Sequence, residues 1–112
     1  MDNFLQEFFA LYGATEILYK ATKDILEKLQ QQTDISSRDI KILETQAKSL
    51  HCVRNSLTDS YCRIEPNYLT YPKKIKERID KYKTLTKKVN EIITESRYFI
   101  ETTKNVGNNV NV

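Results

Sequence analysis

The chain has 112 residues and a formal net charge of +3, with 29% charged and 39% hydrophobic residues. Two glycines and two prolines are too few for the many turns of a β-sandwich or barrel, whereas abundant Lys, Glu, Leu and Ile are typical of helices. No stretch approaches the roughly 18–20 uninterrupted apolar residues of a membrane span, and the first residues lack the basic region of a secretory signal. We therefore predict a cytoplasmic, all-α protein.

The first predicted helix spans residues 2–32. Asp2 is a suitable N-cap, because its carboxylate can accept a free backbone N–H of the first helical turn. Apolar residues then recur at intervals of three and four, which is the spacing of one helix face. Gly13 interrupts this run, where it costs about 1 kcal/mol relative to Ala and indicates either a kink or the close approach of a neighbour. The apolar stripe comprises Phe4, Phe8, Leu11, Leu18, Ile25 and Leu29.

The second predicted helix spans residues 37–64. Ser36, followed three residues later by Asp39, resembles a capping box with Asp in place of the usual Glu. Apolar residues again recur at helical spacing, although Arg54 interrupts the stripe. Pro66 ends the helix, because its ring cannot continue the hydrogen-bond ladder.

The third predicted helix spans residues 72–104. Pro72 suits its first position, where the missing N–H costs nothing, and an Asn-rich segment with Gly107 predicts a flexible tail over residues 105–112. Short connectors place successive helices antiparallel. We therefore predict a single domain over residues 1–104, in which three long amphipathic helices form an up-down-up bundle with coiled-coil-like packing.

Few residues point to catalysis or metal binding. His51 is the single histidine, and Cys52 and Cys62 lie ten residues apart on one helix, roughly 15 Å and too far for a disulfide. The sequence has no zinc-site spacing, no Glu-x-x-His pair and no glycine-rich phosphate loop. Its carboxylates mostly stand four residues from a base, as in Glu44 and Lys48, which marks a solvated face. We expect no enzymatic activity, no cofactor and no metal site.

Positive charge gathers late in the chain. Residues 66–112 carry ten basic and five acidic side chains, whereas residues 1–33 carry three and five. At the start of the third predicted helix, eight Lys and Arg residues are offset only by Glu77 and Asp80. Such a run is usually a solvated face, and the alternative is a surface for an acidic protein or a nucleic acid. The residues predicted to meet an anionic partner are Lys73, Lys74, Lys76, Lys81, Lys83 and Lys88.

Aromatic and apolar residues cover more than one face of the first helix near its start. They either fill one end of the bundle or dock a partner, because a helix that is apolar all round must be buried. In an up-down-up bundle, the connector before the third helix lies at the same end and adds two tyrosines. The residues predicted to bind a protein partner or a second copy are Phe4, Leu5, Phe8, Phe9, Tyr12, Tyr68 and Tyr71.

These patterns indicate a non-enzymatic helical protein–protein interaction module, either a subunit of an oligomeric assembly or a small adaptor- or inhibitor-like protein. The alternative is a nucleic-acid-binding protein that uses the Lys-rich start of the third helix. The two functions differ in their salt dependence, because binding to phosphates weakens steeply as the salt concentration rises.

Overall fold

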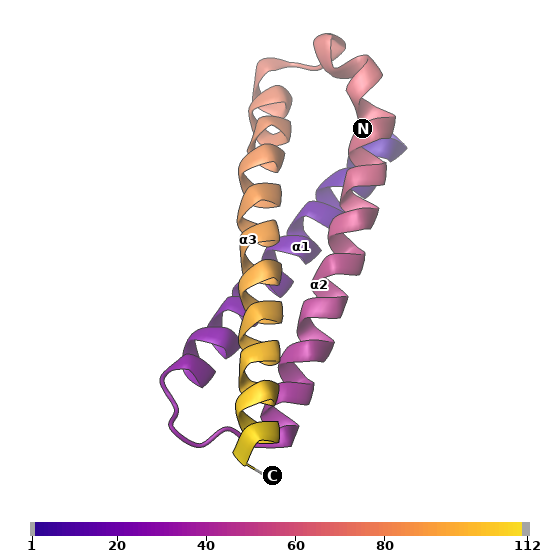
Figure 1. Cartoon of the computed structure of the whole chain (residues 1–112). Coiled ribbons are helices and arrows are strands. Elements are labelled where there is room, and N and C mark those ends of the chain that lie inside the picture. Colours follow the sequence, from indigo (N-terminus) through magenta and orange to yellow (C-terminus); the bar gives the residue numbers. More distant parts are fainter. Residues whose placement is uncertain (1, 111–112) are drawn as a thin grey trace.

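The computed structural model describes the backbone of residues 2–110 and the side chains of residues 2–105. Three long α-helices and one short 3-10 helix make up this part of the chain, which contains no strand, so the predicted all-α class is confirmed. The helices form an elongated bundle with extents of 61 × 20 × 17 Å (Figure 1). In chain order the elements are α1 (Asn3–Gln30), α2 (Ser37–Ile64), η1 (Glu65–Thr70) and α3 (Lys73–Val110).

Local capping sets the starts of the first two helices. The backbone N–H of Phe4 donates to the Asp2 carboxylate at 2.8 Å, as expected for an N-cap. At the start of α2, the N–H of Asp39 donates to the Ser36 hydroxyl at 3.1 Å, and the N–H of Ser36 donates back to the Asp39 carboxylate. This capping box confirms the predicted start, and α2 has the predicted bounds at both ends.

The third helix is longer than predicted. It begins at Lys73 and continues to Val110, so the predicted end at residue 104 is too early. Asn and Gly weaken a helix but remove no backbone donor, unlike proline, and the ladder therefore runs through them. The side chains of residues 106–110 and all of residues 111–112 lie outside the described part, so the flexibility of the tail stays a prediction.

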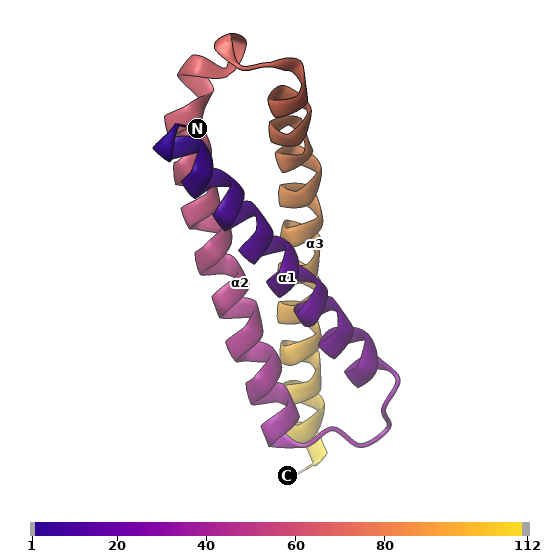
Figure 2. The same cartoon turned by 180° about the vertical axis from the view of Figure 1, so that it is seen from behind.

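The chain reverses direction at each connector (Figures 1 and 2). Two ion pairs tie remote segments together: Arg63 near the end of α2 pairs with Glu7 near the start of α1, and Lys104 pairs with Glu44. Helix α1 crosses the α2–α3 pair obliquely, packing most extensively on α2 and least on α3. The start of α1, the end of α2 and the start of α3 therefore share one end of the bundle.

The core is a single apolar cluster that runs the length of the bundle. All three helices contribute to it. On α2 and α3 the buried side chains follow the predicted three- and four-residue spacing. On α1, by contrast, the predicted stripe is buried only at Phe8 and Leu29, and the core also takes in Leu5 and Leu26 beside that stripe. Its fully buried side chains include Phe8, Leu26, Leu43, Leu50, Leu57, Ile64 and Val89.

Several polar side chains interrupt this core. Thr15 and Thr22 are buried, and each hydroxyl donates to the backbone carbonyl four residues earlier at 2.7 Å. Arg54, which breaks the predicted stripe of α2, is half-buried and donates to the Asn90 side chain across the α2–α3 interface. Thr15 and Thr22 therefore follow the rule that a buried polar group needs a hydrogen-bond partner. The buried Nε of Arg54 and the buried hydroxyls of Ser60 and Ser96 have no such partner among the described residues.

Gly13 lies within α1 without any conformational need for glycine. Its φ is not positive, and a Cβ placed there would meet nothing within 4 Å. Within the described part of the chain, no other segment therefore approaches Gly13 as closely as the sequence indicated. No helix among the described residues is long and apolar enough to cross a membrane.

Candidate partner-binding surface

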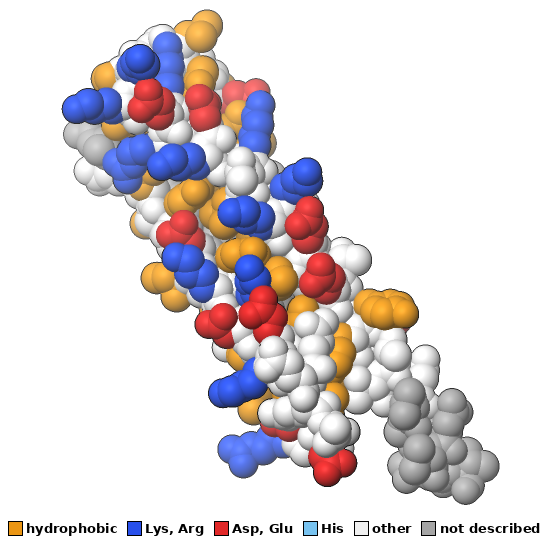
Figure 3. Space-filling model, turned by 90° about the vertical axis from the view of Figure 1, so that its left-hand side faces the viewer, with side chains coloured by type: hydrophobic (Ala, Val, Ile, Leu, Met, Phe, Trp, Pro, Cys, Tyr) orange, Lys and Arg blue, Asp and Glu red, His pale blue; other side chains and the backbone are white. Residues whose placement is uncertain are grey.

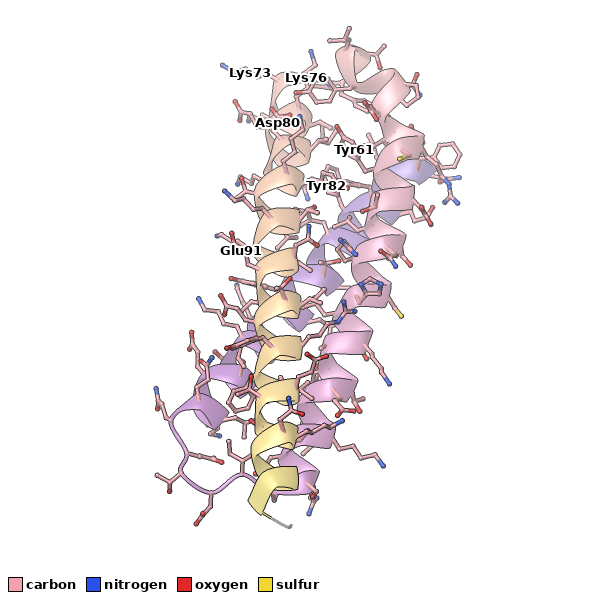
Figure 4. The ribbon with its side chains drawn as sticks, viewed as in Figure 1. Tyr61, Lys73, Lys76, Asp80, Tyr82 and Glu91 are labelled. Carbon is pink, nitrogen blue, oxygen red and sulfur yellow. The ribbon has the colours of Figure 1, made fainter. Side chains whose placement is uncertain are left out.

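An aromatic cluster joins the three helices at the end where the chain begins. The ring of Phe8 lies 6.2 Å from that of Tyr61 on α2 and 6.0 Å from that of Tyr82 on α3. Tyr61 and Tyr82 face each other between α2 and α3 (Figure 4), and the Tyr82 hydroxyl donates to Thr58 at 3.1 Å. Phe8 and Tyr82 are buried and Tyr61 is half-buried, so the cluster is a structural element of the bundle.

The predicted aromatic surface divides into two groups. Leu5 and Phe8 are only 4% and 0% exposed, so they belong to the core of the monomer and are not available on its surface. Phe9 and Tyr12 are half-buried, whereas Phe4 is 48% exposed. The face open to a partner is therefore narrower than the sequence indicated. The partial burial of Tyr12 also raises the pKa of its hydroxyl, and the negative charge of Glu16 adds to this effect.

Phe9 is covered by an arginine that arrives from another helix. The guanidinium carbon of Arg78 lies 3.9 Å from the centre of the Phe9 ring, which is the geometry of a cation–π contact. The sequence placed Arg78 only in the basic run. Its distance of three residues from Ile75 and four from Tyr82 is a signal that it borders the apolar stripe of α3.

The connector tyrosines are held by hydrogen bonds. The Tyr68 hydroxyl donates to the Asp80 carboxylate at 2.6 Å, and the Tyr71 hydroxyl donates to Asp2 at 3.3 Å. The bond to Asp80 raises the pKa of Tyr68, because it stabilises the neutral hydroxyl. Both rings are half-buried, whereas Leu69 between them is 83% exposed. Tyr68 and Tyr71 therefore tie η1 to α3 and α1, and Leu69 is the apolar side chain that sequence analysis missed here.

The predicted lysines lie on the surface of α3 and gather at its start. Five of the six are exposed, while Lys76 is half-buried with its ammonium 5.7 Å from the centre of the Tyr68 ring. Figure 4 shows Lys73 and Lys76 at this end of the helix. Among the described residues, none of the six lies within 4 Å of a carboxylate. Their charge is therefore balanced by solvent or by a partner.

Ion pairing elsewhere differs from the local pairs that the sequence indicated. Glu44 pairs with Lys104 across the α2–α3 interface and not with Lys48 on its own helix. The hydrogen bond from Lys104 lowers the pKa of Glu44 below its ordinary value. In the described part of the chain, the ion pair formed within a single helix joins Lys23 and Glu27, whose charged atoms lie 4.0 Å apart.

The single histidine and the two cysteines have ordinary surroundings. The two ring nitrogens of His51 lie 3.2 Å from Arg54 and 3.3 Å from Asn55. Cys52 and Cys62 are exposed and free. Among the residues that the structure describes, no group of three or more His, Cys, Asp and Glu side chains could hold a metal ion.

The fold and surface together define the class of this molecule as a small all-helical bundle. No family model, curated protein or solved structure matches the chain.

Proposed function

We propose that this protein is a non-enzymatic helical protein–protein interaction module. The observation that supports it is the contact of Arg78 with Phe9, which joins an incompletely buried aromatic row on α1 to a basic row on α3. An aromatic group with a polar rim is the usual composition of a protein-binding surface, in which aromatic residues and Arg are enriched.

In this function the aromatic and basic surface, and not a catalytic site, is the functional part of the molecule. His51 contacts Arg54 and Asn55, neither of which is a nucleophile that it could activate. The half-buried Phe9 and Tyr12 and the exposed Phe4 stand where a partner helix or a second copy would cover them.

A crosslinking experiment tests this function directly. A photoreactive phenylalanine analogue replaces Phe9 in one variant and the exposed Asp59 on α2 in a matched control, and both are illuminated in native extract. We expect a discrete crosslinked product from position 9 and none from position 59. Light scattering on purified protein then shows whether the product is a homodimer. Equal labelling at both positions would contradict the proposal.

Phe9→Glu tests the same surface without a label. The new carboxylate would lie beside Arg78, where its charge is compensated, so the variant should keep its helical content. It should nevertheless lose the crosslinked or co-purified partner, because a charge would stand in the centre of the apolar contact. Retention of the partner at wild-type level would count against the proposed surface.

A further inference from the structure

Half-buried apolar side chains line the seam between α1 and α3, the least extensive of the three helix–helix contacts. On α1, Phe9, Tyr12 and Tyr19 recur at spacings of three and seven and so lie along one line of the helix. The line meets α3 at both ends: Phe9 touches Arg78, and Gln30, three turns beyond Tyr19, borders a hollow against α3. The tyrosines between them therefore face the seam.

The matching line on α3 is also apolar. Leu85, Ile92 and Phe99 follow Arg78 at intervals of seven residues. Leu85 and Ile92 are buried and form the floor of the seam, whereas Phe99 is half-buried. At the lower end the seam opens into a hollow of about 450 Å³. It is lined by Gln30, Thr94, Glu95, Tyr98, Phe99 and Thr102.

The dimensions of this seam suit a helix. From Phe9 to Gln30 the α1 line covers 21 residues, which is about 30 Å along the axis. Tyr98 beside the hollow is 72% exposed, an unusual state for an aromatic side chain within a fold of this size. Figure 3 shows this side of the molecule, on which a band of hydrophobic side chains runs between charged ones and Lys and Arg gather in the upper half.

The charge beside the seam favours one kind of occupant. Lys74, Lys81 and Lys88 each precede a seam residue of α3 by four positions, so they form a row along one side of the seam. None of the three lies within 4 Å of a carboxylate in the described part of the chain, whereas Arg63 and Lys104 are paired across helices. A ligand helix with acidic residues on its flank would supply the missing partners.

We propose, resting on the function proposed above, that the α1–α3 seam binds an acidic amphipathic helix of a partner protein. The apolar face of that helix covers Tyr12, Tyr19 and Phe99, and its carboxylates meet Lys74, Lys81 and Lys88. With a fourth helix in place the bundle is covered on the side that α1 leaves open.

A second copy of this chain fits the seam less well. The apolar stripes of its helices are already buried in its own bundle. Its third helix carries eight basic residues against two acidic ones between Lys73 and Lys88, so two copies of this row repel each other. A nucleic acid would engage the lysines but leave the apolar seam uncovered.

The test uses a fluorescein-labelled peptide of four heptads, with Leu at positions a and d and Glu at e and g. Repulsion between the Glu side chains keeps the peptide from pairing with itself. The second probe is the same peptide with Lys in place of Glu, and a labelled single-stranded oligonucleotide is the third. Anisotropy is measured at about 150 mM salt, where attraction over more than ~8 Å is screened.

We expect the wild type to bind the Glu peptide about tenfold more tightly than the Lys peptide. The reason is that the three exposed lysines of the row attract the Glu side chains of the first probe and repel the Lys side chains of the second. Replacing Lys74, Lys81 and Lys88 by Glu should reverse this preference. The matched control replaces the exposed Lys28, Lys41 and Lys48 by Glu, with the same change in net charge but outside the basic run of α3, and should keep most of the wild-type preference. Tyr19→Glu should weaken binding of both peptides, and circular dichroism checks that each variant is folded.

Equal binding of both peptides, an equal loss in the control variant, or displacement of the Glu peptide by the oligonucleotide would overturn this inference. If the Glu peptide fails while crosslinks from position 9 persist, the interaction module stands and this class of partner is wrong. If no crosslink forms at position 9, the proposed function itself fails.

Discussion

The rings of Tyr61 on α2 and Tyr82 on α3 stack face to face, with 4.3 Å between their centres and 9° between their planes. The two residues are 21 positions apart in the sequence, and the stack spans the interface below the connector. Burial raises the pKa of Tyr61, with a smaller contribution from the charge of Glu65. Phe8 of α1 touches both rings, so this cluster holds the three helices together at the end that carries the proposed surface.

Phe8→Ala should destabilise the bundle far more than Phe4→Ala. Phe8 is fully buried among aromatic rings, and such truncations cost about 3–5 kcal/mol through lost burial and the cavity left behind. Phe4 is 48% exposed, so its truncation should cost no more than about 1 kcal/mol. Urea unfolding followed by circular dichroism gives both free energies. Similar values for the two variants would show that the aromatic cluster is not part of the core.

Gly13→Ala should raise the free energy of unfolding by roughly 0.5–1 kcal/mol. The position is helical and has open space for a methyl group, so alanine gains helix propensity without a clash. Ala10→Gly, at an exposed position one turn earlier, is the matched control and should lower stability by a similar amount. Thermal and urea unfolding measure both changes. A destabilised Gly13→Ala variant would indicate a close neighbour at this point of α1 in solution.

The ion pair between Glu44 and Lys104 should appear in an NMR titration of the Glu44 carboxyl. Its pKa in the folded protein should lie below the ordinary value of 4.5, and Lys104→Met should bring it back towards that value. Lys48→Met, which removes a smaller Coulombic contribution, should change it less. Because the folded-state pKa is lowered, the stabilisation is complete above the ordinary value and is lost as pH falls through the lowered one. An unchanged pKa in Lys104→Met would contradict the pairing.

Binding to nucleic acid should be weak at about 150 mM salt, and this outcome separates the interaction module from the alternative function. If the lysine row did bind phosphates, log affinity would fall linearly with log salt concentration. Replacing Lys74, Lys81 and Lys88 by Ala would then reduce that slope by roughly one unit for each lysine removed. Anisotropy with duplex and single-stranded probes measures it. Tight, salt-dependent binding that this triple change abolishes would favour the nucleic-acid-binding function.

The helices could be predicted because their signals are local. Ser36 and Asp39 satisfy each other's backbone groups across one turn, and Pro66 closes α2 whatever packs against it. The apolar spacing of α2 and α3 likewise identified the face that forms the core, whereas on α1 the buried face is shifted from the predicted stripe towards Leu5 and Leu26. The end of α3 was missed, because Asn and Gly in its last turns lower helix propensity without forbidding the helix.

The binding surface could be predicted only in part. The aromatic start of α1 was visible as an excess of apolar residues, but spacing could not decide which of them the bundle would bury. Leu5 and Phe8 became core while Phe9 stayed half-buried under Arg78, because the oblique path of α1 presents different sides of its stripe to α2 and α3. That path depends on contacts between residues far apart in the chain.

The three amphipathic helices and the caps of the first two can be read from the sequence, because each depends on residues within a few turns of one another. The pairing of Glu44 with Lys104 and the contact of Arg78 with Phe9 join residues on different helices, and they follow only from the packing of those helices. That packing also left Lys74, Lys81 and Lys88 without carboxylate partners among the described residues. The physical reason is that helix propensity acts along the chain, whereas pairing and burial depend on how closely and at what angle the helices pack.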